Sequence, residues 1–215
     1  MKCLAPWHSI LVRFNGDIVP DGVYKARYGN VLKSSLNDVL NSYTATHTKD
    51  SLRMGQLPPE CEQCALKEES VGHSRRLFFR DILNPMVENK EYDYSKNFTD
   101  ILFLEFNMSN ICNLKCRMCN GISSSAWVKE EKKLAEISAD YQRPVDHPEF
   151  GYTNKSEEII QRLFEDPTPF MNLRYLSIKG GEPYMEPANK KILQKFIDLG
   201  VAKNVTLDWT TNGTI

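Results

Sequence analysis

The sequence predicts an α/β fold in which parallel strands alternate with helices, preceded by a small α+β module that binds metal. Two observations support this fold class. From residue 100 onward, apolar runs of strand length alternate with helical patterns, which is typical of βαβ units. The six cysteines form two groups of three, and the first group lies in residues 3–64, ahead of that alternation. A chain of 215 residues has room for both parts.

The first part, residues 1–85, begins with a predicted hairpin. Two strand-like runs flank Asn15-Gly16, a pair that tolerates the positive φ angles of a tight turn. Ser34 or Ser35 is expected to cap a helix further along this part. The predicted elements are strands at 9–13 and 18–20, a turn and short strand at 28–32, a helix to about residue 42, and a helix from residue 64 to about residue 83.

A polar stretch at residues 86–99, directly after Pro85, is predicted to link this part to the second one at residues 100–215. Because the second part alternates strands with helices, we expect its strands to be parallel. The predicted strands are 101–106, 173–178 and 204–210, and the predicted helices are 123–140, 156–165 and 188–199.

One face of each predicted strand in the second part becomes polar toward the carboxyl end of the strand. Glu105, Lys179 and Asp208 occupy such positions. A parallel sheet is normally apolar on both faces, and burying an unpaired charge is costly. This polar face is therefore expected to line a wet or ligand-filled lumen at the carboxyl edge of the sheet, where ligands of α/β folds bind. Lys179 and Asp208 are expected to touch cofactor or substrate, or to pair with each other.

The second group of cysteines follows the strand predicted at 101–106. Cys112, Cys116 and Cys119 are separated by three and then two residues. Clustered thiolates select iron–sulfur clusters or zinc. A structural zinc site needs four ligands, whereas three thiolates from a single loop suit a four-iron cluster whose fourth iron stays open. Disulfides are disfavoured, because the chain shows no secretory signal.

This C-x3-C-x2-C spacing resembles the radical S-adenosylmethionine (radical SAM) superfamily. Two later stretches resemble further motifs of that family, namely Gly180-Gly181-Glu182-Pro183 (GGEP) and Thr211-Asn212-Gly213 (TNG). The resemblance implies a [4Fe–4S] cluster on Cys112, Cys116 and Cys119 that cleaves S-adenosylmethionine to a 5′-deoxyadenosyl radical, which abstracts hydrogen from a substrate. The cofactor-binding residues that it implies are Met118, Gly180, Gly181, Glu182, Pro183 and Asn212.

The barrel of this family usually has more βα units than the three strands predicted here. The fold expected for residues 100–215 is therefore a partial radical SAM (β/α) barrel with an open edge. We expect that the chain is a fragment, or that another chain supplies the partner strands. Glu182 is expected either to bind the ammonium group of the cofactor's methionine moiety or to order its own loop.

Residues 1–85 resemble the auxiliary iron–sulfur domains called SPASM and Twitch. The resemblance rests on Cys3 with Pro6-Trp7, on the hairpin and on the later Pro59-x-Cys61-x2-Cys64. In the SPASM pattern a cysteine follows the hairpin glycine by five positions, and here that position holds Asp21. The implied auxiliary ligands are Cys3, Cys61, Cys64 and Asp21. In the alternatives, Asp21 is only a turn residue of Pro20-Asp21-Gly22, or the module binds zinc.

These features together predict a radical SAM enzyme. Relatives with SPASM or Twitch domains often modify peptides, so we expect a peptide or protein substrate and an electron donor such as a flavodoxin or ferredoxin. The alternative is an iron–sulfur electron-transfer module or a zinc-binding interaction module without S-adenosylmethionine chemistry.

Charge and hydropathy bear on partners and location. The net charge of −1 gives no reason to expect nucleic acid as a partner. No apolar run approaches the ~20 residues of a membrane span, and no signal-peptide core precedes Trp7. A cytoplasmic location without a membrane partner is therefore expected.

Overall fold

Six strands form one mixed sheet, in the order β3-β2-β1-β4-β5-β6. The computed structural model describes residues 3–88, 94–95, 100–138, 141 and 155–215. Strands β1, β4, β5 and β6 run parallel to one another, whereas β2 and β3 are antiparallel to their neighbours. The predicted α/β class is therefore confirmed. The strands are β1 Ser9–Arg13, β2 Asp17–Val19, β3 Gly29–Asn30, β4 Phe103–Asn107, β5 Tyr175–Lys179 and β6 Thr206–Trp209.

The predicted N-terminal hairpin is confirmed. Gly16 at its turn has a φ of 84°, and Leu11 of β1 lies opposite Val19 of β2. The other edge of β1 pairs in parallel with β4, where Leu11 lies opposite Glu105. Strands of the two predicted parts of the chain therefore belong to one continuous sheet.

The helix predicted from residue 64 to about 83 is wrong, because the structure has two helices there. Helix α4 (Glu62–Val71) ends at Gly72, whose φ of 69° is left-handed. Helix α5 (Arg75–Val87) begins after Ser74, whose side chain accepts a hydrogen bond from the backbone N–H of Leu77. Helix α5 also continues through Pro85, where the linker was expected to begin.

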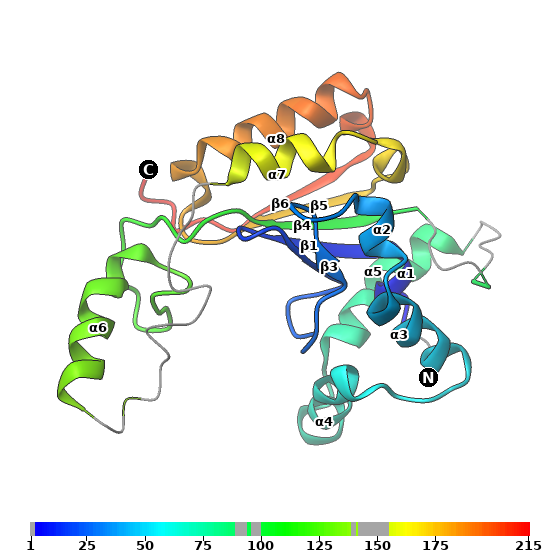
Figure 1. The fold of residues 1–215 in the computed structure, drawn as a ribbon, viewed down its shortest axis with the longest axis horizontal. Coiled ribbons are helices and arrows are strands. Elements are labelled where there is room, and N and C mark those ends of the chain that lie inside the picture. Colours follow the sequence, from blue (N-terminus) through cyan, green and yellow to red (C-terminus); the bar gives the residue numbers. More distant parts are fainter. Residues whose placement is uncertain (1–2, 89–93, 96–99, 139–140, 142–154) are drawn as a thin grey trace.

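The other helices of the N-terminal half are short. Ser35 caps α2 (Leu36–Leu40), as predicted. Ser42 caps α3 (Tyr43–Arg53), which the sequence analysis did not predict. The remaining elements of this half are α1 (Ala5–His8) and the 3-10 turn η1 (Pro59–Cys61). Figure 1 shows α1, α3, α4 and α5 on one side of the sheet, opposite the side that α7 and α8 cover.

In the C-terminal half, the predicted strands and helices are found with ends shifted by a few residues. Gly200, with a φ of 72°, follows α8 as expected. The sequence also predicts an insertion loop at residues 141–154, which, apart from Tyr141, lies outside the described residues. The elements are 3-10 turns η2 (Ser125–Trp127), η3 (Thr168–Phe170), η4 (Pro183–Met185) and η5 (Ala202–Asn204), and helices α6 (Val128–Ile137), α7 (Ser156–Leu163) and α8 (Pro187–Asp198).

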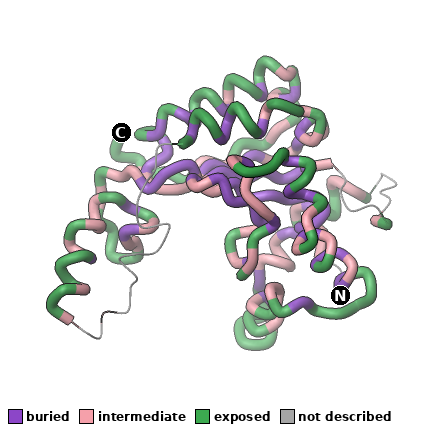
Figure 2. The backbone as a smooth tube through the Cα atoms, viewed as in Figure 1, coloured by how far each residue is buried: buried purple, intermediate pink, exposed green. Residues whose placement is uncertain are grey.

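Helix α6 differs from expectation in its packing. The pattern of Trp127, Leu134 and Ile137 predicts a face turned toward the core, yet Leu134 is 39% exposed and Ile137 is 79% exposed. Figure 2 shows this segment as mostly exposed, at a distance from the buried strands. An apolar stripe marks the face that a helix can bury, but it does not say whether the same chain covers it.

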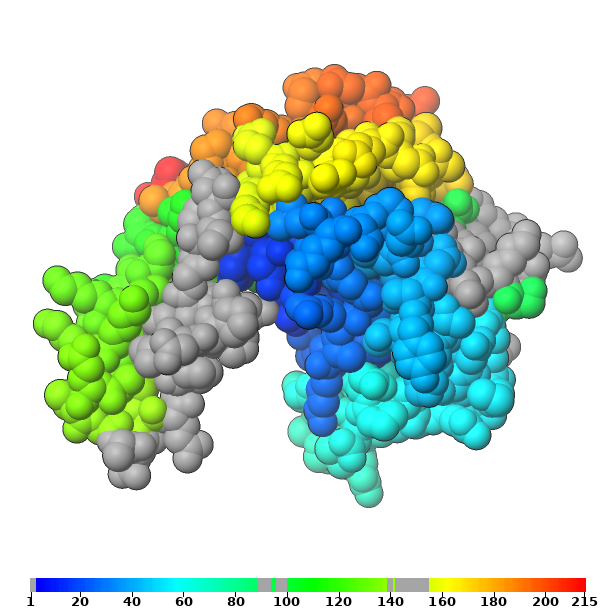
Figure 3. Space-filling model, viewed as in Figure 1, coloured from blue at the N-terminus to red at the C-terminus, as the bar shows by residue number. Residues whose placement is uncertain are grey.

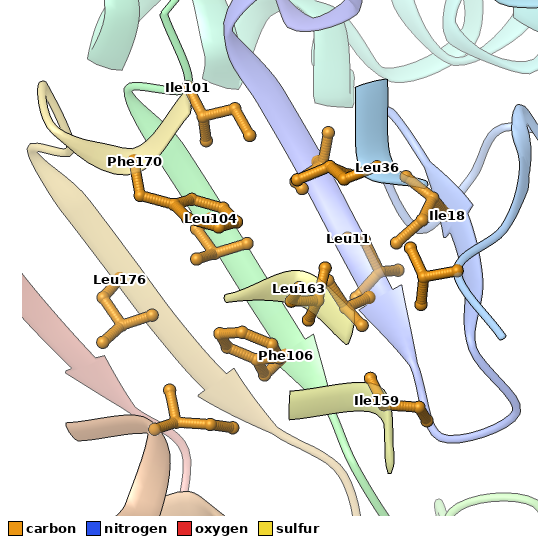
Figure 4. Packing of buried hydrophobic residues seen from close by; sticks show 14 of the residues in the cluster. Leu11, Ile18, Leu36, Ile101, Leu104, Phe106, Ile159, Leu163, Phe170 and Leu176 are labelled. Atoms are coloured by element: carbon orange, nitrogen blue, oxygen red, sulfur yellow. The ribbon is translucent and has the colours of Figure 1, made fainter. Parts of the chain in front are cut away.

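The main core lies between the sheet and helices α2, α7 and α8. Figure 4 shows Leu104, Phe106 and Leu176 of the strands packed with Ile159 and Leu163 of α7. A second apolar cluster joins Phe79 and Leu83 of α5 to Leu102 and Phe103 on the other side. The sheet is thus held between two layers, and its carboxyl edge is left for the loop that carries Cys112, Cys116 and Cys119.

The described strands form an open sheet. An open edge was expected, but the barrel shape predicted for residues 100–215 is not confirmed. Strands β3 and β6 form its two edges, and Leu207 of β6 is 48% exposed. In Figure 3, α6 (green) and the N-terminal residues (blue and cyan) extend from the molecule in the same direction, at its two sides. None of the helices in the described segments has both the length and the apolar character required to cross a membrane.

Candidate metal centres

The loop after β4 carries the second cysteine group. Cys112 and Cys119 are half-buried and Cys116 is exposed. The backbone N–H of Leu114 donates to Cys112 Sγ at 3.4 Å, and Cys119 N donates to Cys116 O at 3.0 Å. Burial raises the pKa of Cys119, and the charges of Cys116 and Cys112 raise it further. The three thiols are therefore close enough to influence one another.

Two glycines allow the loop after β5 to lie directly against the chain that enters the cysteine loop. Gly180 has a φ of 97°, and a Cβ added there would lie 2.2 Å from Asn107 Oδ1. A Cβ on Gly181 would lie 2.1 Å from the backbone oxygen of Ile111. Glu182 N donates to that same oxygen at 2.6 Å. Larger residues would push the GGEP segment away from the cysteines.

Glu182 ties the GGEP segment to the TNG segment. Its side chain is fully buried and accepts hydrogen bonds from Asn212 N at 2.8 Å, Tyr184 N at 3.2 Å and Thr211 Oγ1 at 2.8 Å. Burial alone would raise the pKa of Glu182, but these hydrogen bonds outweigh burial and lower it. The loop-ordering role that the sequence offered for Glu182 is therefore present.

Asn212 brings the third loop to the cysteines. Its Nδ2 donates to Asn113 Oδ1 at 3.0 Å and approaches Cys112 Sγ at 3.8 Å. Pro183 is buried at the start of η4, whereas Met118 is 91% exposed, so Met118 does not fill the core. The structure therefore gathers the cysteine loop, the GGEP segment and Asn212 at the carboxyl edge of three parallel strands (Figure 1).

Three side chains to which the sequence analysis gave no role at the cysteine loop form hydrogen bonds with the backbone of that loop. Ser124 Oγ donates to Leu114 O at 2.7 Å, and Ser125 Oγ accepts from Cys112 N at 3.2 Å. Trp127 Nε1 donates to Cys116 O at 3.1 Å. These residues fall in the stretch predicted as helix from 123, and only the tertiary arrangement shows that they face the loop.

The charged residues of the sheet find protein partners. Glu105 is 8% exposed and forms ion pairs with Lys179 at 3.0 Å and with Arg75 of α5 at 3.5 Å. Asp208 accepts a hydrogen bond from Ser177 Oγ at 2.8 Å. The predicted polar face therefore exists, with Lys179 paired to Glu105 rather than to Asp208.

The first cysteine group lines a single cavity, which we call the auxiliary cavity. Cys3, Cys61 and Cys64 line it together with Asp21 and Glu60. Burial raises the pKa of Cys3 to about 12 and that of Cys61 to about 12, and in both cases the charge of Asp21 adds to the effect. The four side chains predicted as auxiliary ligands are thus brought to one cavity from the segment before α1, the turn after β2, η1 and α4.

Asp21 serves the turn as well as the cavity. Its Oδ1 accepts a hydrogen bond from Val23 N at 2.7 Å, which is the turn role that the sequence offered as the alternative. Burial raises the pKa of the Asp21 carboxyl, although hydrogen bonds from backbone N–H groups and the charge of Arg75 act in the opposite direction.

The residue types that line the auxiliary cavity are those that bind iron–sulfur clusters. All six cysteines of the chain are free thiols. Three of them line the cavity, and thiolates are the usual ligands of iron–sulfur clusters. No group of three or more His, Cys, Asp or Glu side chains in the described segments is arranged to hold a metal ion. The ligand assignments at both cysteine groups therefore stay predictions.

Comparison with protein families bears on the first of these groups. The model of the SPASM family, described as an iron-sulfur cluster-binding domain, matches residues 3–65. Comparisons with curated proteins and with solved structures gave no match. The matched range contains Cys3, Asp21, Cys61 and Cys64, and thus the auxiliary cavity. The chain therefore carries a SPASM iron–sulfur cluster-binding domain at residues 3–65.

Proposed function

We propose that the chain is a radical SAM enzyme with an auxiliary iron–sulfur site. The observation that carries the proposal is the meeting of the C-x3-C-x2-C loop, the GGEP segment and Asn212 at the carboxyl edge of β4, β5 and β6. The SPASM match supports it, because SPASM domains occur in radical SAM enzymes. When bound, a [4Fe–4S] cluster supplies the electron that cleaves S-adenosylmethionine and so starts hydrogen abstraction from a substrate.

At this edge of the sheet, different residues would bind the cluster and the cofactor. Cys112, Cys116 and Cys119 would bind iron through their thiolates. Gly180 and Gly181 keep the backbone of the GGEP segment close to the cysteine loop. The methionine moiety of the cofactor would then approach the backbone of the GGEP segment. We assign the remaining contacts with S-adenosylmethionine to Met118, Glu182, Pro183 and Asn212. Glu182 would act there while it holds the TNG segment in place.

The auxiliary cavity would hold a second cluster on Cys3, Cys61 and Cys64, with Asp21 proposed from the sequence as the fourth ligand. We propose a peptide or protein as the substrate and a flavodoxin or ferredoxin as the electron donor. The partial-barrel fold of residues 100–215 is part of the same proposal.

The test is anaerobic reconstitution with iron and sulfide, followed by addition of dithionite and S-adenosylmethionine. Release of 5′-deoxyadenosine is expected from the unmodified chain and from Cys3→Ala, and it should be lost in Cys116→Ala. A full-length, cluster-replete protein that releases none would contradict the proposal and favour an electron-transfer or zinc-binding module. Iron counts of each variant show whether the lost activity follows from the lost cluster.

A further inference from the structure

Glu60 is a half-buried residue that the proposed site does not yet use. It lies in the turn η1 (Pro59–Cys61), directly before Cys61, and lines the auxiliary cavity together with the three thiols. Its Oε2 is buried and has no hydrogen-bond partner within the described ranges. A buried carboxylate oxygen without a hydrogen-bond donor costs free energy, so an acceptor atom that the described protein groups leave unsatisfied lies at this cavity.

The basic residue of the cavity wall does not pair with this oxygen. Arg76 is the basic side chain among the described residues that line the cavity. Its Nε donates to Glu68 Oε1 at 2.9 Å, and its NH2 group forms an ion pair with Glu68 Oε2. The guanidinium thus holds the end of α4 to the start of α5. Arg76 is therefore not a partner of Glu60 Oε2, which is left able to bind a metal ion in the cavity.

Asp21 and Glu60 differ in how far the protein already satisfies them. The carboxylate of Asp21 accepts a short hydrogen bond from Val23 N as part of a turn. Glu60 leaves Oε2 buried and unmatched within the described part of the chain. Of the two carboxylates that line this cavity, Glu60 is the one with a buried oxygen that receives no hydrogen bond from the described protein groups.

We propose that Glu60, rather than Asp21, supplies the fourth, carboxylate ligand to the auxiliary iron–sulfur cluster, beside the thiolates of Cys3, Cys61 and Cys64. This inference rests on the proposed auxiliary site. Carboxylate oxygen is a harder ligand than thiolate and binds iron less tightly. One iron of the cluster is therefore held less firmly than the other three and is the one that exchanges or is lost first.

The test isolates the auxiliary cluster in a chain with Cys112, Cys116 and Cys119 replaced by alanine. Iron and sulfide per chain are counted and EPR spectra recorded after anaerobic reconstitution, before and after mild oxidation with ferricyanide. Glu60→Gln keeps the shape of the side chain but removes its charge. We expect iron to fall from about four to about three per cluster on oxidation of this variant, with a three-iron EPR signal. Glu60→Cys should restore resistance to oxidation, and Glu62→Gln, an exposed neighbour, should match the unmodified site.

The inference is overturned if Glu60→Gln gives the same iron count and spectra as the unmodified site, including the case in which only Asp21→Asn changes them. The same spectra taken on the chain with all six cysteines present guard against misfolding of the triple variant. If no auxiliary cluster forms with Cys3, Cys61 and Cys64 intact, the auxiliary part of the proposed function falls together with Glu60. Release of 5′-deoxyadenosine tests the proposed site at Cys112, Cys116 and Cys119 independently of the auxiliary cluster.

Discussion

At the scale of single residues, Glu182 is the carboxylate on which the edge of the sheet depends most. It receives hydrogen bonds from the loop after β6 and from its own loop, and it has no exposure to water. We expect Glu182→Gln to lower the free energy of unfolding by about 1–3 kcal/mol, because at least one backbone N–H loses a charged acceptor. Urea unfolding at pH 7 measures this, with the exposed Glu158→Gln as the control.

The pH dependence of this residue has a definite sign. The folded-state pKa of Glu182 lies below its usual value of 4.5, and the unfolded chain has the usual value. Its contribution to stability is therefore complete above that value and is lost as the pH falls through the folded pKa. The difference between the unmodified chain and Glu182→Gln should shrink on acidification from pH 6 toward pH 3. A difference that stays constant would show that the carboxylate charge is not what stabilises the loops.

Lys49 on α3 leads to a prediction about stability at alkaline pH. It is fully buried, and its Nζ donates to Leu40 O at 3.1 Å. Burial, assisted by the charge of Arg53, lowers the pKa of Lys49 to about 8, against the ordinary 10.5 of the unfolded chain. Between these values the unfolded chain binds more protons, so stability should rise with pH by up to about 1.4 kcal/mol per unit.

Substitution separates this contribution from those of other groups. Lys49→Met keeps most of the buried volume and should remove the rise in stability between pH 8 and 10, whereas the exposed Lys33→Met should keep it. Thermal unfolding followed at several pH values measures both. An unchanged rise in Lys49→Met would mean that another group titrates.

At the scale of elements, the loops after β4 and β5 pack without room for a methyl group. A Cβ on Gly181 would meet the backbone of Ile111, which cannot move without shifting the cysteine loop. We expect Gly181→Ala to lower the free energy of unfolding by about 1–3 kcal/mol and to reduce the iron bound by Cys112, Cys116 and Cys119. Gly22→Ala, where the nearest atom to the added Cβ lies at 3.8 Å, is the matched control. Equal iron content in the two variants would contradict this prediction.

The sequence predicted those elements whose causes are local. Asn15-Gly16 was enough for the hairpin, and the βα alternation was enough for three parallel strands. The break between α4 and α5 has local causes as well, in Gly72 and Ser74, but the continuing helical pattern concealed them. The exposed apolar stripe of α6 depends on what covers it, which sequence periodicity does not report.

The candidate sites also contain residues that the sequence predicted and residues that only the structure revealed. Cysteine spacing and the GGEP and TNG segments led to residues that the structure brings together, because each follows the carboxyl end of a parallel strand. Glu60 was not found, because its significance lies in a missing partner, and a sequence does not show partners. The pairing of Glu105 with Arg75 joins residues from distant elements and was equally out of reach.

At the scale of the whole molecule, the parallel pairing of β1 with β4 makes the two halves of the chain depend on each other. Five residue pairs join these strands, from Ser9 opposite Phe103 to Arg13 opposite Asn107. The main core mixes side chains of both halves, such as Ile18 and Val39 with Leu104 and Ile159. Separation would leave two open strand edges and two incomplete cores.

We therefore predict that the chain unfolds in one cooperative transition, although the auxiliary domain and the rest of the chain carry separate cysteine groups. Two variants that keep a single tryptophan, Trp7 in the first half or Trp209 in the second, report on the halves separately. Their fluorescence transitions in guanidinium chloride should coincide with each other and with the loss of helical circular dichroism. Residues 1–88 and 100–215, produced separately, should lack cooperative transitions and regain one when they are mixed. If the Trp7 transition clearly precedes or follows the Trp209 transition, or if residues 1–88 melt cooperatively alone, the first half is an independent folding unit and the β1–β4 pairing is only a docking contact.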